Sequence, residues 1–137
     1  MNFRILLPGV LTLMAAPGTL AETSVWSCAV ERRIENGRTD FFKPGPAQPM
    51  LILAINEPAG RGCVLATAAD TSCSASFTNI SRVNDVLRMD RIGEDGRLDL
   101  INIFEASGRF IRIHGTIQWM GAQRACVRRN APSVAIR

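Results

Sequence analysis

The clearest pattern in the chain is a strict alternation of apolar and polar residues from Gly108 to Met120. Side chains of a β-strand alternate between its two faces, so this pattern predicts a strand that buries one face. The predicted core face carries Ile111, Ile113, Gly115, Ile117 and Trp119, and the predicted outer face carries Phe110, Arg112, His114, Thr116 and Gln118. The turn Ser107-Gly108 and the β-rich run from Arg97 to Ala106 precede it, which predicts a hairpin.

Similar short runs fill the rest of the chain, with turn residues between them. Asn36-Gly37 and Asp95-Gly96 are strong turn signals, and the continuously apolar run from Met50 to Ile55 is typical of a central strand. Ser81 to Gly93 fits a helix or a strand, and we favour a strand from Asp85 to Ile92.

Together these runs predict an all-β domain of about eight strands. The fold that we expect is a small antiparallel meander that forms a closed or nearly closed β-barrel, because closure protects the sheet edges. A β-sandwich is the alternative. In either fold, disulfide bonds would staple the strands together.

The first 21 residues have the layout of a secretory signal peptide. Arg4 is followed by an apolar stretch from Ile5 to Ala16 and by small residues that end at Ala21. We therefore expect residues 1–21 to be removed, 22–129 to form a single β-barrel-like domain, and 130–137 to be a flexible tail. The expected location is periplasmic or secreted, with no integral membrane span in the mature chain.

Four cysteines remain after this cleavage, and an even number in an exported chain indicates two disulfides. Three pairings are possible. We favour Cys63 with Cys73, across a short connection, and Cys28 with Cys126, which would join the first strand to the last. Zinc is the rival interpretation, but the chain has no Cys-x-x-Cys pair and a single histidine, so we expect no metal and no cofactor.

Basic residues gather towards the C-terminus. From Ala106 onward the chain has six arginines and no acidic residue. If the last two strands pair, Arg112, Arg124 and Arg128 would form a positive stripe beside Phe110 and His114. Guanidinium groups bind carboxylate, phosphate or sulfate in a two-pronged way, which makes these five residues the candidate ligand or partner site. The alternative is that Asp90, Asp99 and Glu105 on neighbouring strands pair with these arginines.

Nothing near His114 in the sequence resembles an activated nucleophile, so we expect no catalytic residues. The leading hypothesis is an exported, non-catalytic binding module whose partner is another exported protein, such as an enzyme that it inhibits, or an anionic envelope ligand. Nucleic acid is not an expected partner, because export separates the chain from it. Two alternatives stay open: a small periplasmic hydrolase that uses His114 with a spatially close carboxylate, and a structural envelope component with an uncharged, flat surface.

Overall fold

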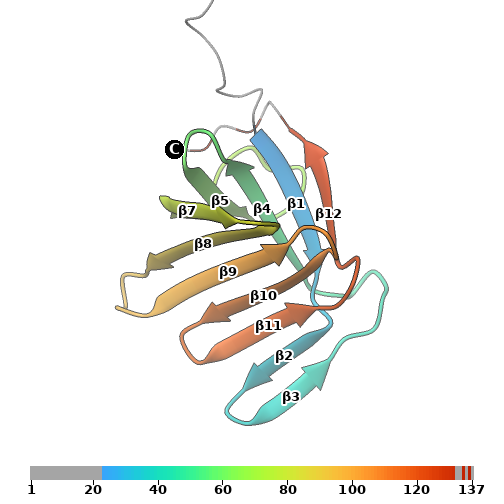
Figure 1. Ribbon diagram of the computed structural model, residues 1–137. Helices are drawn as coiled ribbons and strands as arrows, with labels where there is room; N and C mark the ends of the chain where they lie inside the picture. Colours follow the sequence, from blue (N-terminus) through green and yellow to red (C-terminus); the bar gives the residue numbers. More distant parts are fainter. Residues whose placement is uncertain (1–22, 132–133, 135, 137) are drawn as a thin grey trace, which may run out of the picture.

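The computed structural model describes residues 23–131, 134 and 136, and its strands form two antiparallel sheets (Figure 1). Sheet A has five strands, which in spatial order are β12 (Cys126–Asn130), β1 (Thr23–Ala29), β4 (Met50–Asn56), β5 (Arg61–Leu65) and β6 (Ala75–Phe77). Sheet B has seven strands, which in spatial order are β3 (Arg38–Phe41), β2 (Arg32–Glu35), β11 (Ile117–Gly121), β10 (Arg109–His114), β9 (Leu98–Phe104), β8 (Val86–Ile92) and β7 (Asn79–Val83).

The all-β class is confirmed, but the closed barrel and the count of about eight strands are wrong. The described residues form twelve strands in two open sheets, a sandwich-like arrangement in which β1, β4 and β12 run from top to bottom of Figure 1 and β8 to β11 run across it. Between β1 and β2 the chain changes sheets from one residue to the next. Val30 N–H donates to Pro49 O, whereas the next amide, Glu31 N–H, donates to Met120 O of β11 in sheet B.

The main core lies between the two sheets. Sheet A contributes alternate residues of its central strands, and sheet B contributes one face of β8, β9 and β10. The largest buried members are Trp26, Leu51, Leu53, Ile55, Phe77, Leu87, Met89, Ile101, Ile103 and Phe110. The opposite face of sheet A, with Val25, Ile52 and Leu65, packs against Ala131 and Val134 in a second cluster. Burial of both faces explains why the run from Met50 to Ile55 is continuously apolar.

The run from Gly108 to Met120 is two strands, not the single strand expected. β10 ends at His114, Gly115 adopts φ 61°, and β11 returns with Ile117 opposite His114. A two-residue turn inverts the parity of the alternation, so Trp119 lies opposite Arg112 and shares its face.

The expected core face of β10 is also wrong. Phe110 is buried between the sheets, whereas Ile111 and Ile113 on the other face are half-exposed. Gly121 lies directly opposite Phe110, and a Cβ at Gly121 would come within 2.5 Å of the Phe110 ring. The missing side chain therefore makes the space that the phenylalanine fills.

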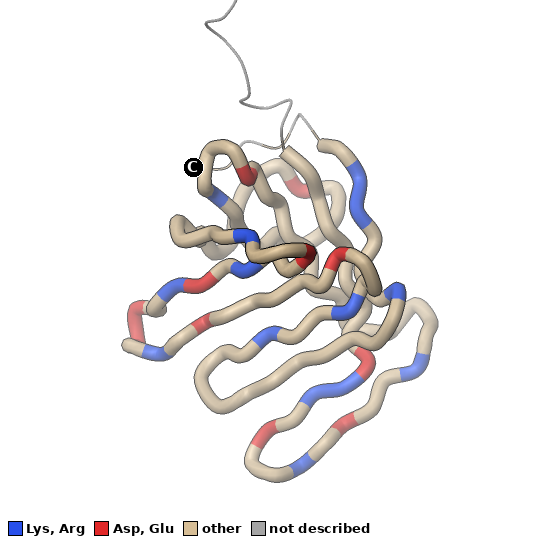
Figure 2. The backbone as a smooth tube through the Cα atoms, viewed as in Figure 1, with Lys and Arg blue, Asp and Glu red and all other residues tan. Residues whose placement is uncertain are grey.

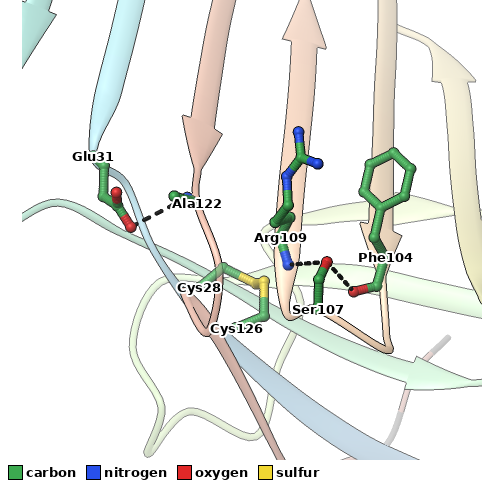
Figure 3. The surroundings of a disulfide bond; sticks show 7 residues. All are labelled: Cys28, Glu31, Phe104, Ser107, Arg109, Ala122 and Cys126. Atoms are coloured by element: carbon green, nitrogen blue, oxygen red, sulfur yellow. Dashed lines mark hydrogen bonds between the residues drawn. A yellow bond between two sulfur atoms is a disulfide. The ribbon is translucent and has the colours of Figure 1, made fainter.

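Two disulfides account for all four cysteines, in the pairing that the sequence favours. Cys28–Cys126 joins directly opposed residues of β1 and β12, which confirms the pairing of the first strand with the last (Figure 3). Cys63–Cys73 connects β5 to the loop before β6.

The ends of the chain are described only in part. The expected signal peptide, residues 1–21, lies outside the described residues. In the expected tail, Asn130 ends β12, and Ala131 and Val134 are buried against sheet A. No helix of the described residues is long and apolar enough to cross a membrane.

Candidate functional site

The five residues proposed as a binding stripe do not lie together. Phe110, Arg112 and His114 are on β10, which is flanked by β9 and β11, whereas Arg128 is on β12 in the other sheet. Arg124 lies in the turn before β12. The stripe required pairing between the last two strands, and that pairing is absent because β12 pairs with β1. Figure 2 shows basic positions spread over both sheets, with acidic positions between them in sheet B.

Phe110 and Arg112 face the interior rather than a partner. Phe110 is 2% exposed and belongs to the core, so its expected role as an exposed aromatic contact is wrong. The guanidinium of Arg112 makes a two-pronged contact with Asp99, with Nε–Oδ1 and Nη2–Oδ2 distances of 2.9 and 2.8 Å. Asp99 has no exposed surface, so the cross-strand pairing kept as the alternative is present here.

An aromatic ring and a second arginine lie next to this buried ion pair. The Arg112 guanidinium lies 5.4 Å from the centre of the Trp119 ring. Arg91 approaches the same Asp99 oxygen that Arg112 Nη2 contacts, with 3.8 Å between Arg91 Nε and Asp99 Oδ2. Two guanidiniums thus lie near one carboxylate at the border of the core. Their arrangement stabilises sheet B and directs two donors of Arg112 at Asp99 rather than at a ligand.

A catalytic histidine needs a carboxylate partner, and Asp99 lies opposite His114 in the strand register, but the two side chains form no ion pair. Both carboxylate oxygens of Asp99 instead accept hydrogen bonds from Arg112. Within the part of the chain that the structure describes, His114 forms no ion pair with any carboxylate, and its ring lies 6.4 Å from that of Trp119. The geometry gives no support to a histidine–carboxylate pair.

Arg124 and Arg128 lie in different environments. Arg124 adopts φ 64° in an exposed turn, where its amide donates to Ser107 O at 2.7 Å. Arg128 lies opposite Trp26 in the register of β1 and β12, and its side chain reaches a cleft between the two sheets. We call this hollow the inter-sheet cleft; it is lined also by Glu57, Arg82 and Glu105.

A second hollow lies at one end of sheet B, where β2, β3, β9, β10 and β11 meet. We call it the aromatic groove; its volume is about 570 Å³. Its apolar lining consists mainly of Phe41, Phe42, Phe104, Ile111, Met120 and Ala122, and the almost fully buried Phe110 touches it only with its small exposed surface. Pockets of this size with a mainly apolar lining and a few polar groups are typical of ligand sites.

The charged residues of the aromatic groove are Arg32, Arg109 and Glu31. Arg109 extends over the Phe104 ring, 5.7 Å from its centre, and Figure 3 shows the two side chains on neighbouring strands. Arg32 donates to Met120 Sδ at 3.2 Å. Neither arginine forms an ion pair with a carboxylate of the described residues. Glu31 also lines the groove, and its carboxylate accepts a hydrogen bond from the neutral Ala122 amide. With two guanidiniums and one carboxylate, the groove presents a net positive charge beside apolar surface.

Sequence reasoning missed the phenylalanines at the end of β3, although a signal was present. Two consecutive phenylalanines at the end of a strand must point to opposite faces, so one of them is forced towards solvent. Phe41 is 75% exposed, and Phe42 packs against the core. Exposed large aromatics of this kind are common in contact sites.

The charged rim of the inter-sheet cleft is tightly paired on one side. Arg82 of β7 holds Glu57, in the β4–β5 turn, by two hydrogen bonds of 2.7 and 2.8 Å, and it also donates to Glu105. The hydrogen bonds from Arg82 lower the pKa of Glu57, with a smaller contribution from the charge of Arg128. A glutamate general acid needs a raised pKa, so this arrangement opposes acid catalysis at neutral pH.

No protein-family model, curated protein or solved structure matches this chain.

Proposed function

We propose that this protein is an exported, non-catalytic binding module whose aromatic groove holds an anionic amphiphile of the cell envelope. The occupant would place an acyl or aromatic group on the phenylalanine lining and a carboxylate, phosphate or sulfate against the arginines. One observation carries this proposal: Arg109 and Arg32 lie beside the apolar lining, and neither is paired with a carboxylate of the described residues.

The physical argument rests on complementarity. Apolar surface left open to water favours an apolar occupant by roughly 25 cal/mol per Å² buried. An unneutralised guanidinium in the same hollow favours an anion, and it binds oxyanions in a two-pronged way. A ligand with both properties satisfies both demands, whereas a neutral or cationic amphiphile satisfies only the first.

Two further features support a binding role outside the cytoplasm. Disulfides persist in oxidising compartments, and both disulfides of this chain are compatible with such a location. The surface over the C-terminal strands is charged and hollowed, which does not fit the uncharged, flat surface expected of a structural envelope component. His114 has no carboxylate contact in the described residues, which favours a non-catalytic role over the hydrolase alternative.

Calorimetric titration with dodecanoate and with a neutral dodecyl oligo(ethylene glycol) ether, both below micelle formation, tests the proposal. We expect dodecanoate to bind more tightly. Arg109→Ala should weaken dodecanoate binding about tenfold, the effect of losing one hydrogen bond to a charged group, and should leave binding of the neutral ether unchanged. Arg97→Ala is the matched control, because Arg97 is an exposed arginine at the β8–β9 turn, outside the groove.

Three results would overturn this function. The first is equal affinity for the two amphiphiles, and the second is an equal loss in the Arg97→Ala control. The third is Arg109-dependent capture of an acidic exported protein, at a groove that dodecanoate does not block, which would assign the surface to a protein partner.

A further inference from the structure

The inter-sheet cleft is a separate hollow from the aromatic groove, and the two share no lining residue. Its volume is about 480 Å³, and it lies where the β4–β5 turn and strands β1 and β12 of sheet A approach β7 and β8 of sheet B. Trp26, Ile55 and Leu87 form its apolar floor. A hollow of this size accommodates a small organic molecule.

The charges that line the cleft balance. Two carboxylates, Glu57 and Glu105, face two guanidiniums, Arg82 and Arg128. An anion entering this site would meet the glutamates, and a cation would meet the arginines, so neither sign of ionic ligand gains from the overall field. The electrostatics therefore favour a neutral ligand.

The charged side chains of the cleft can form further hydrogen bonds with a ligand. A carboxylate can accept about four hydrogen bonds, and each oxygen of Glu57 accepts one from Arg82. Arg128 forms no ion pair of 4 Å or less with a described carboxylate, although its charge acts on Glu57 from a greater distance. Arg82 donates to both glutamates and holds them in position. The rim thus combines fixed acceptors with a guanidinium that has donors to spare.

We propose that the inter-sheet cleft is a second binding site and that its ligand is a neutral saccharide. A sugar ring carries hydroxyl groups that both donate and accept hydrogen bonds, and its C–H groups form an apolar face. The hydroxyls match the glutamates and Arg128, and the apolar face matches the floor formed with Trp26. This inference is independent of the function proposed for the aromatic groove.

Tryptophan fluorescence can report on this cleft alone. The chain has two tryptophans, and Trp119 does not line the cleft, so Trp119→Phe leaves Trp26 as the only emitter. This variant is titrated with glucose, galactose, N-acetylglucosamine and maltose, and with two charged relatives, glucuronate and glucosamine. Because Trp119 packs against the core, amide chemical shifts of the wild-type chain provide a second readout that needs no variant.

We expect a saturable change with at least one neutral sugar and weaker binding of its charged relatives. Arg128→Ala should weaken that binding about tenfold. Arg129→Ala is the matched control, because Arg129 is the next residue of the same strand and its guanidinium instead donates to Ala68 O at 2.5 Å. Arg109→Ala in the groove should have no effect.

Several results would overturn the proposal. The first is the absence of any saturable change, by fluorescence and by amide shifts, up to about 10 mM of every neutral sugar, a limit that corresponds to very weak binding. The second is a charged sugar that binds as tightly as its neutral relative. The third is equal weakening by Arg128→Ala and Arg129→Ala.

Discussion

Asp99 illustrates how one buried carboxylate determines the roles of its neighbours. It has no exposed surface, and removal of a carboxylate's partner in such a place leaves an uncompensated charge. Arg112 donates two hydrogen bonds to the Asp99 carboxylate, whereas Arg91 Nε lies 3.8 Å from Asp99 Oδ2 and donates no hydrogen bond. The two arginines near Asp99 should therefore differ in their contribution to stability.

We predict that Arg112→Ala lowers the free energy of unfolding by about 3 kcal/mol, because Asp99 stays buried without its hydrogen-bond donors. Arg91→Ala should cost clearly less. Urea unfolding of the two variants, followed by circular dichroism, measures both values. Equal losses for the two variants, or a loss below about 1 kcal/mol for Arg112→Ala, would contradict this account of the pair.

At the scale of elements, the sequence predicts strands better than it predicts the faces they bury. The turns at Asn36-Gly37 and Ser107-Gly108 and the strand near Asp85 to Ile92 are confirmed, because turn chemistry and apolar runs are local. The parity error in β10 arose because alternation continues unbroken through the Gly115 turn while the chain reverses. Which face is buried depends on where sheet A packs, and that is not a local property.

The candidate site was harder to predict for the same reason. Arginine positions are visible in the sequence, but their partners are decided by register: Arg112 meets Asp99, whereas Arg109, three residues earlier, meets Phe104. Proximity in sequence suggested one stripe. The pairing of β12 with β1 instead divided the arginines between two sheets.

The two disulfides should contribute unequally to stability. In the chain-entropy model, the gain grows with the length of the closed loop, and the two bridges span sequence separations of 98 and 10 residues. We predict a loss of about 4–5 kcal/mol for the Cys28→Ala/Cys126→Ala double variant and about 2–3 kcal/mol for the Cys63→Ala/Cys73→Ala pair. Denaturant unfolding of the oxidised proteins measures both losses. The reverse order would show that packing around these bridges, rather than loop closure, dominates.

At the scale of the whole molecule, the two-sheet arrangement could not be predicted from the pattern of strands. Barrels and sandwiches share short alternating strands, and they differ in where the chain crosses between layers. Within the described residues the chain crosses between the sheets four times: at Val30–Glu31, over residues 42–49, at Thr78 and over residues 122–125. The crossing over residues 42–49 is rich in proline, but the crossings at Val30–Glu31 and at Thr78 have no glycine, proline or other turn signal that marks them.

Arg82 connects the two sheets, because it belongs to β7 of sheet B and binds Glu57 in a turn of sheet A. This contact lowers the pKa of Glu57 in the folded chain below its ordinary value of 4.5. A carboxyl group with a lowered folded pKa stabilises the fold above its unfolded pKa. That contribution is lost as the pH falls through the folded value.

We therefore predict that the free energy of unfolding decreases between about pH 5 and pH 3, and that Arg82→Gln flattens this decrease while reducing stability at pH 7. Urea unfolding at a series of pH values measures the slope for each chain. Arg61→Gln, an exposed arginine of β5, is the control and should keep the wild-type slope. If Arg82→Gln keeps that slope as well, the glutamate does not depend on Arg82, and the cohesion of the two sheets at that end must come from their apolar contacts alone.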